Sequence, residues 1–418
     1  MGLKINDIKA EIIYSKKRLR QRGVDYAAVF KDMSASVKQE IEEIRILRNN
    51  GLSVIPEIDF KSLGEKGFSD DDRALVKKRG CVIIRNTFES SLAKDWNEEL
   101  GRYIEEVGYY ENPDKGLDKY FSSLQEGKYH HPQIFSVYWS RPQIQARQHE
   151  NLATIRRFLN GLWKYHVDGK PIFDPDQECT YADRTRRREP GDNSLGIKPH
   201  IDGGSVERWL ENSGYQSVYR HLLDGNWEKY DPFDAAYRTE TSQISSPAVC
   251  SMFRTFQGWT ALSSQGPGDG TLQLIPSARV LGWMILRALQ DDVPDDELCG
   301  AQPGRALSCE PEWHDLVLEG LCTIPEMQVG DSIWWHGDLV HAVEDEHNGK
   351  ESSNVIYIGA APYCEKNVSF LDAQAKCFMV GKSSPDFAAE DYELDFKGRS
   401  RISDLSELGK KQMGLEAW

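Results

Sequence analysis

The chain has 418 residues, a net charge of -15 and a charged fraction of 28%, which is typical of a soluble globular protein of one or two domains. It contains no long basic run, and no stretch approaches the roughly 18 consecutive apolar residues of a membrane span, so we expect neither nucleic-acid nor membrane partners. Eight cysteines occur without a Cys-x-x-Cys pair, and the N-terminus lacks the apolar core of a signal peptide. We therefore expect reduced thiols and a cytoplasmic protein.

Residues 1–78 are expected to form a helical arm. Apolar residues recur at helical spacing between positions 37 and 44, and Gly51 is a suitable helix terminator. We interpret the arm as a packing or dimerisation element rather than a catalytic one. The main domain is then expected to span residues 79–418.

A strand with three arginines on one face is predicted over residues 181–188. Because side chains alternate along a strand, Arg184, Arg186 and Arg188 project from the same side. Two interpretations follow. The guanidinium groups are either solvated or paired with acidic residues, or one of them reaches an anionic substrate, since a planar guanidinium suits carboxylate and phosphate.

The sequence KPHIDGG at residues 198–204 is the first candidate site. His200 and Asp202 are two residues apart, so on an extended strand their side chains project from the same face. The pair is either the start of a metal site or a histidine bonded to a nearby carboxylate. The segment that follows, at about residues 205–250, is predicted to be a helical insertion that covers the site as a lid or wall.

A second motif, GDSIWWHGDLVH, occupies residues 330–341. It is predicted to be a Gly-Asp turn followed by an apolar strand. A second imidazole from this distant strand would complete the set of two histidines and one carboxylate that holds iron(II) on one face and leaves the opposite face open. The motif offers His336 and His341. A third possibility, the adjacent pair His130 and His131, would place its two rings on opposite sides of a strand, so we expect packing roles for them.

The layout of the second motif, with a histidine ten residues after Gly-Asp, resembles the distal-histidine strand of phytanoyl-CoA-hydroxylase-like iron(II)/2-oxoglutarate dioxygenases. KRGCVIIRNTF at 78–88 and GDGTLQLIPS at 268–277 resemble other passages of that superfamily. More closely, three stretches resemble the YbiU-like family of bacteria and its fungal relatives: RTFQGWTAL (254–262), DDVPDDELCG (291–300) and AAPYCEKN (360–367). This second similarity extends over nearly the whole chain.

The resemblance implies a mainly β fold with helical decoration, in which a double-stranded β-helix (a cupin-like jelly roll) forms the core. It also implies that His200, Asp202 and His341 hold iron(II), and that 2-oxoglutarate and dioxygen are co-substrates in the oxidation of a small molecule. His336, five residues before His341, would then lie on the opposite face of the strand.

The chain departs from the superfamily in one respect. A basic residue shortly after the distal histidine commonly pairs with the far carboxylate of 2-oxoglutarate, but only Lys350 and Lys366 occur there, and neither position is suitable. A buried carboxylate needs a cationic or multi-donor partner, because a buried charge without one is costly.

Arg254, in an otherwise apolar stretch, is the first candidate for this anchor, and Arg238 is the second. A structural ion pair is the alternative role for Arg254. Asn354 and Tyr357, on the strand after His341, are predicted to donate further hydrogen bonds to the co-substrate.

Two other functions compatible with the sequence remain. A metal-binding scaffold or sensor would keep the three ligands without turning over 2-oxoglutarate. A redox-neutral cupin-type enzyme would use another divalent ion.

Overall fold

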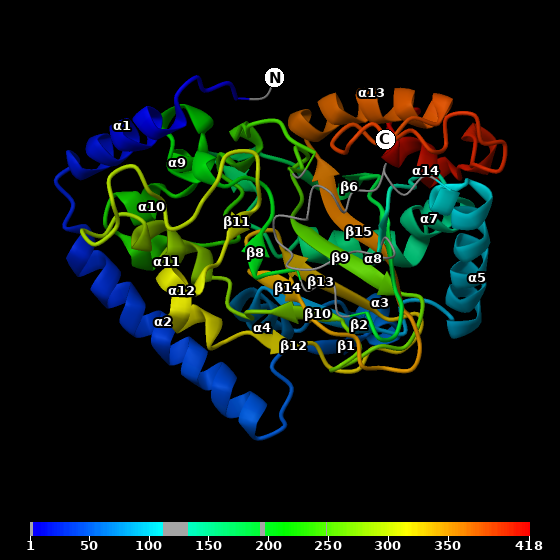
Figure 1. The fold of residues 1–418 in the computed structure, drawn as a ribbon, viewed down its shortest axis with the longest axis horizontal. Coiled ribbons are helices and arrows are strands. Elements are labelled where there is room, and N and C mark those ends of the chain that lie inside the picture. Colours follow the sequence, from blue (N-terminus) through cyan, green and yellow to red (C-terminus); the bar gives the residue numbers. More distant parts are fainter. Residues whose placement is uncertain (1–2, 112–132, 193–196, 248) are drawn as a thin grey trace.

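Two β-sheets lie at the centre of the molecule, and helices gather at both ends, as the computed structural model in Figure 1 shows. The structure describes residues 3–111, 133–192, 197–247 and 249–418. The larger sheet has the order β1-β2-β13-β9-β15-β7-β3, with β6 also paired to β15. Its strands are β1 (Glu57–Asp59), β2 (Cys81–Arg85), β13 (Ser332–His336), β9 (Phe256–Ala261), β15 (Ser353–Tyr363), β7 (Thr185–Arg188), β3 (Ile134–Phe135) and β6 (Asp174–Cys179).

The smaller sheet has the order β11-β8-β14-β10-β12, and all its pairings are antiparallel. Its strands are β11 (Leu307–Ser308), β8 (His200–Ile201), β14 (His341–Val343), β10 (Leu272–Leu274) and β12 (Cys322–Thr323). A separate hairpin joins β4 (His166–Val167) to β5 (Lys170–Pro171).

The two main sheets share one apolar cluster. It includes Ile333 and Trp335 of β13 and Val355 of β15 from the larger sheet, and Leu272 and Leu274 of β10 from the smaller one. Period-two alternation produces this arrangement, because every second side chain of each strand faces the opposite sheet.

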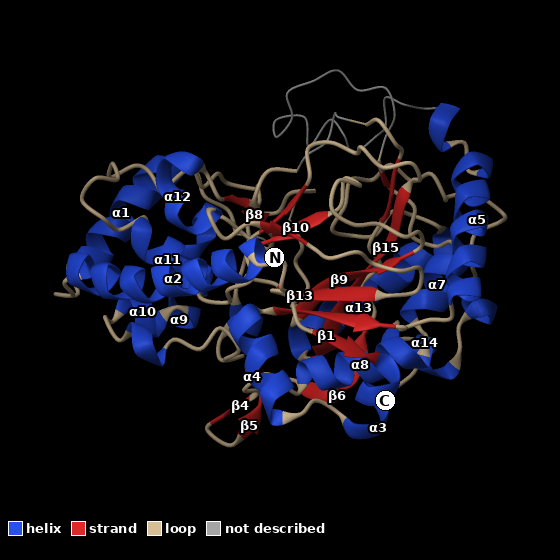
Figure 2. Cartoon of the chain, turned by 90° about the horizontal axis from the view of Figure 1, so that it is seen from below, coloured by secondary structure: helices blue, strands red, loops and turns tan. Residues whose placement is uncertain are grey.

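One group of helices lies at one end of the sheets, and the remaining helices cover the other end and the side of the larger sheet (Figures 1 and 2). One group consists of α1 (Ile8–Arg20), α2 (Tyr26–Asn49), α9 (Tyr215–Val218), α10 (Arg220–Leu223), α11 (Val280–Arg287) and α12 (Pro311–Leu318). The others are α3 (Phe60–Lys66), α4 (Asp70–Arg79), α5 (Ser90–Glu106), α7 (Arg141–Arg147), α8 (Glu150–Asn160), α13 (Glu365–Val380) and α14 (Glu407–Gln412). Helices cover more of the described chain than strands do, so the fold is mixed rather than mainly β.

The predicted N-terminal helix is confirmed as α2, with Val37, Ile41 and Ile44 fully buried. The same region also contributes β1, which pairs in parallel with β2 and so connects it to the larger sheet. None of the helices in the described ranges is both long and apolar enough to cross a membrane.

The segment at 205–250 is broken into short pieces rather than the long helices that its apolar spacing predicted. It contains the four-residue helices α9 and α10, and the 3-10 turns η4 (Val206–Arg208), η5 (Glu211–Ser213), η6 (Trp227–Lys229) and η7 (Arg238–Glu240). Gly214 lies between η5 and α9 with φ +83°, and a Cβ there would meet the carbonyl oxygen of Glu240 at 2.9 Å. This close approach ends the local helix, which apolar spacing alone does not reveal.

Candidate metal centre

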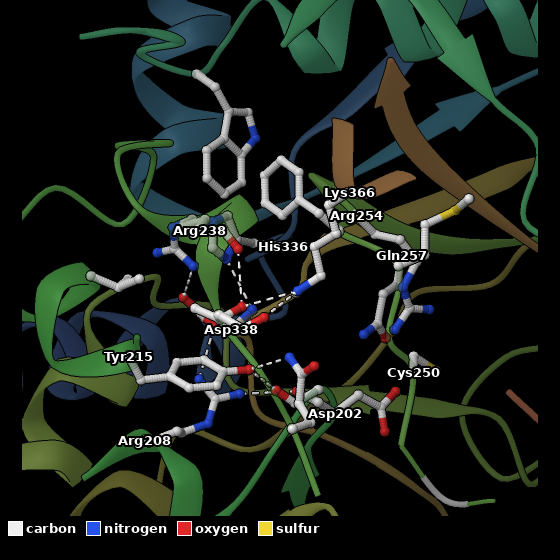
Figure 3. A pocket seen from close by; sticks show the side chains of 18 residues that line it. Asp202, Arg208, Tyr215, Arg238, Cys250, Arg254, Gln257, His336, Asp338 and Lys366 are labelled. Atoms are coloured by element: carbon white, nitrogen blue, oxygen red, sulfur yellow. Dashed lines mark hydrogen bonds and ion pairs between the residues drawn. The ribbon is translucent and has the colours of Figure 1, made fainter. Parts of the chain in front are cut away.

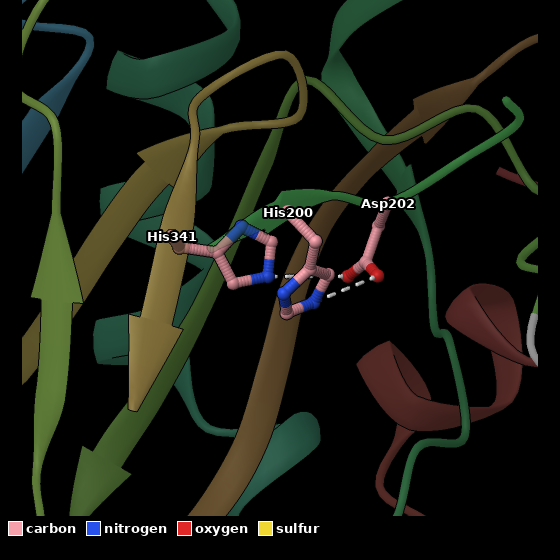
Figure 4. Close-up of side chains that lie close together, drawn as sticks. All are labelled: His200, Asp202 and His341. Carbon is pink, nitrogen blue, oxygen red and sulfur yellow. Dashed lines mark ion pairs between the residues drawn. The ribbon is translucent and has the colours of Figure 1, made fainter. Parts of the chain in front are cut away.

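Three side chains that are far apart in sequence meet where β8 and β14 pair. His200 of β8 and His341 of β14 are direct partners in the antiparallel register, and their ring centroids are 4.2 Å apart. Asp202 follows β8, and its two carboxylate oxygens lie 3.6 Å from His200 Nε2 and 3.5 Å from His341 Nε2 (Figure 4). The candidate ligand atoms all lie within 4.8 Å of one another.

Backbone carbonyls set the orientation of both imidazole rings. His200 Nδ1 is 2.8 Å from the carbonyl oxygen of Lys198, and His341 Nδ1 is 3.1 Å from that of Leu339. Because a carbonyl oxygen can only accept, each Nδ1 carries the proton and each Nε2 presents its lone pair to the centre. This is the tautomer that a metal ion requires, and such outer hydrogen bonds usually fix it.

The electrostatics of the centre favour the ligand forms of these groups. Burial and the neighbouring His341 lower the pKa of His200 to about 4, so its ring is neutral at physiological pH. Burial raises the pKa of Asp202, but the two imidazoles and Arg254 outweigh it and hold this pKa well below its usual range. A neutral imidazole beside an ionised carboxylate is the protonation state that binds a divalent metal.

The loop after Asp202 is held by Arg208. Gly203 and Gly204 have φ of +81° and +106°, which allows the chain to turn immediately after the carboxylate. Arg208 then donates from Nη2 to the carbonyl of Asp202 and from Nε to the carbonyl of Gly204, both at 3.0 Å.

Asp338 connects this loop to the strand that carries His341. Its carboxylate pairs with Arg208 Nη1 at 3.3 Å and with Arg238 Nη1 at 2.7 Å, and all three side chains are nearly fully buried (Figure 3). Neither arginine was assigned this role from the sequence. The signal available was Asp338 itself, an acidic residue within a strongly apolar motif.

His336 lies away from the metal cluster, in an aromatic environment. Its ring stacks on Trp163 with centroids 4.7 Å apart, and it contacts Phe233 at 4.8 Å. Its Nδ1 accepts from the backbone of Asp338 at 3.0 Å, and its Nε2 lies 3.1 Å from the carbonyl of Pro232. Both ring nitrogens therefore already have hydrogen-bond partners within the protein, so neither is available to a metal ion. His130 and His131 fall outside the described residues.

A cavity of about 530 Å³ opens beside the three ligands. Asp202, His200 and His341 contribute to its wall, together with residues of both sheets, including Trp259 and Trp335. Its volume falls within the range of about 300–1,000 Å³ that small-molecule sites occupy.

Arg254, the first candidate anchor, lines this cavity just before β9. Its guanidinium lies 5.0 Å from the ring centroid of Tyr181, and with the described residues it forms no hydrogen bond or ion pair. Asp202 and Cys250 are among the groups that act on its pKa, which is raised above the usual range even though burial lowers it. The structure therefore contains a guanidinium that lies over the Tyr181 ring and belongs to a residue lining the same cavity as Asp202.

Arg238, the second candidate, is already engaged. Besides Asp338, it donates to the carbonyls of Pro232 and Asp234. It lines a smaller cavity of about 70 Å³ on the other side of Arg254, not the large one. Lys366 also lines the small cavity and donates to Thr241.

Of the two residues predicted to assist on β15, Tyr357 lines the large cavity and Asn354 does not. Asn354 is buried on the other side of the sheet, where its amide donates to Asn97 of α5 at 3.0 Å. Position 357 comes three after position 354. Because this offset is odd, the two side chains face opposite sides of the strand. Placing Asn354 at the co-substrate was therefore wrong.

Arg184, Arg186 and Arg188, the three arginines predicted to share one face, differ in their surroundings, and only the last two lie within β7. Arg184 and Arg186 line the large cavity, whereas Arg188 is fully buried and donates to four backbone carbonyls, those of Gly270, Glu344, Asp192 and Asp345.

Known proteins similar to this chain cover nearly all of it. YbiU of Escherichia coli strain K12 is 39% identical over 412 residues, which is 98% of this chain and 97% of YbiU. A Salmonella typhimurium LT2 crystal structure, provisionally named an oxidoreductase, is 40% identical with a TM-score of 0.90, covering 99% of both chains. The GlcNAc Inducible Gene 2 protein of Candida albicans is 27% identical with a TM-score of 0.83, covering 100% of this chain and 91% of that one. The profile of the Gig2-like family matches residues 6–415, and the chain belongs to that family.

Proposed function

We propose that the protein is an iron(II)- and 2-oxoglutarate-dependent oxygenase that oxidises a small molecule. The observation that carries the proposal is the convergence of His200, Asp202 and His341 at one wall of a large cavity. Two imidazole nitrogens and one carboxylate oxygen on one side of a point suit iron(II) and leave the cavity side open for other ligands. The provisional oxidoreductase name of the Salmonella relative supports the same chemistry.

The chemistry that iron(II) with 2-oxoglutarate supplies is the activation of dioxygen for oxidation of a C–H bond. The side chains of this protein bind and orient. Backbone carbonyls hold the His200 and His341 rings with Nε2 inward, and Arg208 holds the loop of Asp202. Arg254 is placed to pair with the far carboxylate of the co-substrate, since guanidinium and carboxylate match in geometry as well as charge.

A double-stranded β-helix core is part of the same proposal. Two features support it: both sheets contribute to one apolar cluster, and both histidines lie on adjacent antiparallel strands of the smaller sheet. We also propose a cytoplasmic location, which is supported by the eight free cysteines of the chain.

The test is an anaerobic titration of iron(II) and then 2-oxoglutarate, following the metal-to-ligand charge-transfer absorbance. We expect this absorbance to develop with both additions and to be absent in Asp202→Ala, because the anionic ligand is lost. Admission of oxygen should then yield succinate.

The same measurements separate the alternatives. Iron binding without the 2-oxoglutarate absorbance and without succinate would support a metal-binding scaffold or sensor. Metal analysis of protein purified without oxygen addresses the cupin-type alternative, which predicts a divalent ion other than iron. Either result contradicts the proposal.

A further inference from the structure

We propose that helix α13 and the segment after it set the position of Arg254, and that they act through the ring of Tyr181. The inference rests on the proposed function, in which Arg254 binds the far carboxylate of 2-oxoglutarate, and it adds the residues that orient this guanidinium. Tyr181 lies in the connection between β6 and β7, and its ring centroid is 5.0 Å from the guanidinium carbon of Arg254. Tyr181 does not belong to the described wall of either the large or the small cavity, whereas Arg254 lines both. The ring is therefore a support behind the arginine and not a contact for a ligand.

An aromatic ring suits this task because it holds a cation without using its hydrogen-bond donors. A guanidinium is attracted to the face of a ring, and the N–H groups at its edge stay available for a carboxylate. Arg238 shows the contrast, since each of its three nitrogens donates to Asp338 or to a backbone carbonyl. Tyr181 can thus fix the place of Arg254 while the donors of Arg254 remain for the co-substrate.

Asp386, in the segment that follows α13, connects the ring to the chain that leads to Arg254. The hydroxyl of Tyr181 donates to the Asp386 carboxylate at 2.9 Å. The same carboxylate accepts from the backbone N–H of Ser251 at 2.8 Å and from the Ser251 hydroxyl. Ser251 is three residues before Arg254. One carboxylate therefore holds both partners of the contact, the ring through its hydroxyl and the arginine through its backbone.

A buried amide of α13 holds the backbone on both sides of Tyr181. Gln374 accepts from the backbone N–H of Ala182 and donates to the carbonyl of Thr180, both at 2.8 Å. Its side chain is fully buried. Because both ends of the amide are bonded, and an unmade bond would leave a buried polar group without a partner, the backbone that carries the ring is fixed against α13.

A second buried amide of α13 holds the backbone just before Arg254. Asn367 accepts from the N–H of Phe253 and donates to the carbonyl of Phe253, both at 2.8 Å. The stem of Arg254 then passes close to Gly359 of β15, where an added Cβ would lie 3.5 Å from the Arg254 Cδ. Helix α13, which packs against both β6 and β15, thus holds the segment of the ring and the segment of the arginine at once (Figure 1).

The test is a double-mutant cycle on the dissociation constant of 2-oxoglutarate, taken from the anaerobic charge-transfer titration. Tyr181→Leu removes the aromatic face and should weaken 2-oxoglutarate binding roughly 2- to 30-fold, the effect of a cation–π contact, while iron(II) affinity stays unchanged. In Arg254→Ala no guanidinium remains to be oriented, so Tyr181→Leu should cause no further weakening. A role of Tyr181 in folding alone would not make its effect depend on Arg254.

Further variants separate the ring from its hydroxyl. Tyr181→Phe keeps the aromatic face and loses only the bond to Asp386, so its dissociation constant should lie between those of the wild type and Tyr181→Leu. Asp386→Ala removes the acceptor shared by Tyr181 and Ser251, and its effect should also depend on Arg254. Asp386→Ala takes the place of Tyr181→Leu in the cycle if the latter does not fold.

The matched control is Tyr237→Leu. The ring of Tyr237 lies 5.2 Å from the guanidinium carbon of Arg220, and neither residue belongs to the described wall of the two cavities. This substitution removes a contact of the same kind at another place, so the dissociation constant of 2-oxoglutarate should not change.

The outcomes distinguish failure of the inference from failure of the proposed function. An unchanged dissociation constant in folded Tyr181→Leu overturns the inference and leaves the oxygenase standing. An equal loss in the wild type and in Arg254→Ala does the same, because the ring would then act on something other than the guanidinium. If no 2-oxoglutarate absorbance develops in the wild type, the proposed function fails and the inference fails with it.

Discussion

The turn between β13 and β14 separates two regions that use the same residue types in opposite ways. On one side, the closed region consists of Trp163, Arg208, Arg238, His336 and Asp338, in which every charged group and both nitrogens of the histidine have protein partners. On the other side, the open region is the large cavity with His200, Asp202, His341 and Arg254.

The difference teaches that residue type alone does not mark a functional site. His336 and His341 are five residues apart in one motif, but only His341 directs a free nitrogen lone pair toward other ligands. Arg238 and Arg254 differ in the same way, because Asp338 pairs with Arg238 while no described carboxylate pairs with Arg254. Chemistry requires groups whose bonding capacity the fold leaves unused.

The largest expected effect is the loss of iron(II) binding when a ligand of the open region is removed. His341→Ala should abolish iron(II) binding, because it removes one of three ligands, whereas His336→Gln should retain it. Iron content and binding are measured anaerobically on folded proteins of both kinds. Loss of iron in His336→Gln with retention in His341→Ala would show that His336, and not His341, is the metal ligand.

The second prediction breaks the closed region. Asp338→Asn removes the carboxylate shared by Arg208 and Arg238 and leaves two guanidinium groups buried without it, so the free energy of unfolding should fall by about 3–5 kcal/mol. Urea denaturation measures this fall. The control is Asp372→Asn, in an exposed pair with Lys376 on α13, which should change stability by no more than about 0.5 kcal/mol. Equal, small effects for the two variants would contradict a structural role for Asp338.

The third prediction sharpens the contrast between the arginines. Arg254→Ala should weaken 2-oxoglutarate binding by about 2–5 kcal/mol, or roughly 30- to several-thousand-fold, because one partner of a charge-assisted pair is lost. Arg254→Lys should recover little, since an ammonium does not reproduce the planar fork. The dissociation constant is taken from the charge-transfer titration. An unchanged value in folded, iron-replete Arg254→Ala would contradict Arg254 as the anchor.

The sequence predicted best what depends on local periodicity. His200 and Asp202 are two residues apart, and this spacing predicted that their side chains lie together. The helical spacing of apolar residues around Ile41 predicted α2. It predicted least what depends on contacts between distant segments. Nothing near Arg238 in the sequence indicates that Asp338, one hundred residues later, is its partner.

Two further differences have the same physical origin. Asn354 was grouped with Tyr357 by proximity, although an odd separation on a strand reverses the face. The insertion at 205–250 has helical spacing, but the close approach of Gly214 to Glu240 and the ion pair of Arg208 with the distant Asp338 accompany its division into short turns. Tertiary contacts can override local spacing in such a segment.

The smallest expected effect is a pH dependence of stability caused by His336 in the closed region. Burial lowers the pKa of His336 from 6.5 to about 4, so the unfolded state binds more protons than the folded state in this window. Its contribution to stability is therefore complete above pH 6.5 and is lost as the pH falls toward 4. Between pH 7.5 and 5.5 the free energy of unfolding should fall by about 1.4 kcal/mol more in the wild type than in His336→Gln. His314, whose pKa burial also lowers to about 4, titrates in both proteins and cancels in the difference. Urea denaturation at the two pH values measures it, and an equal pH dependence in both proteins would show that the His336 ring is not held neutral by its aromatic surroundings.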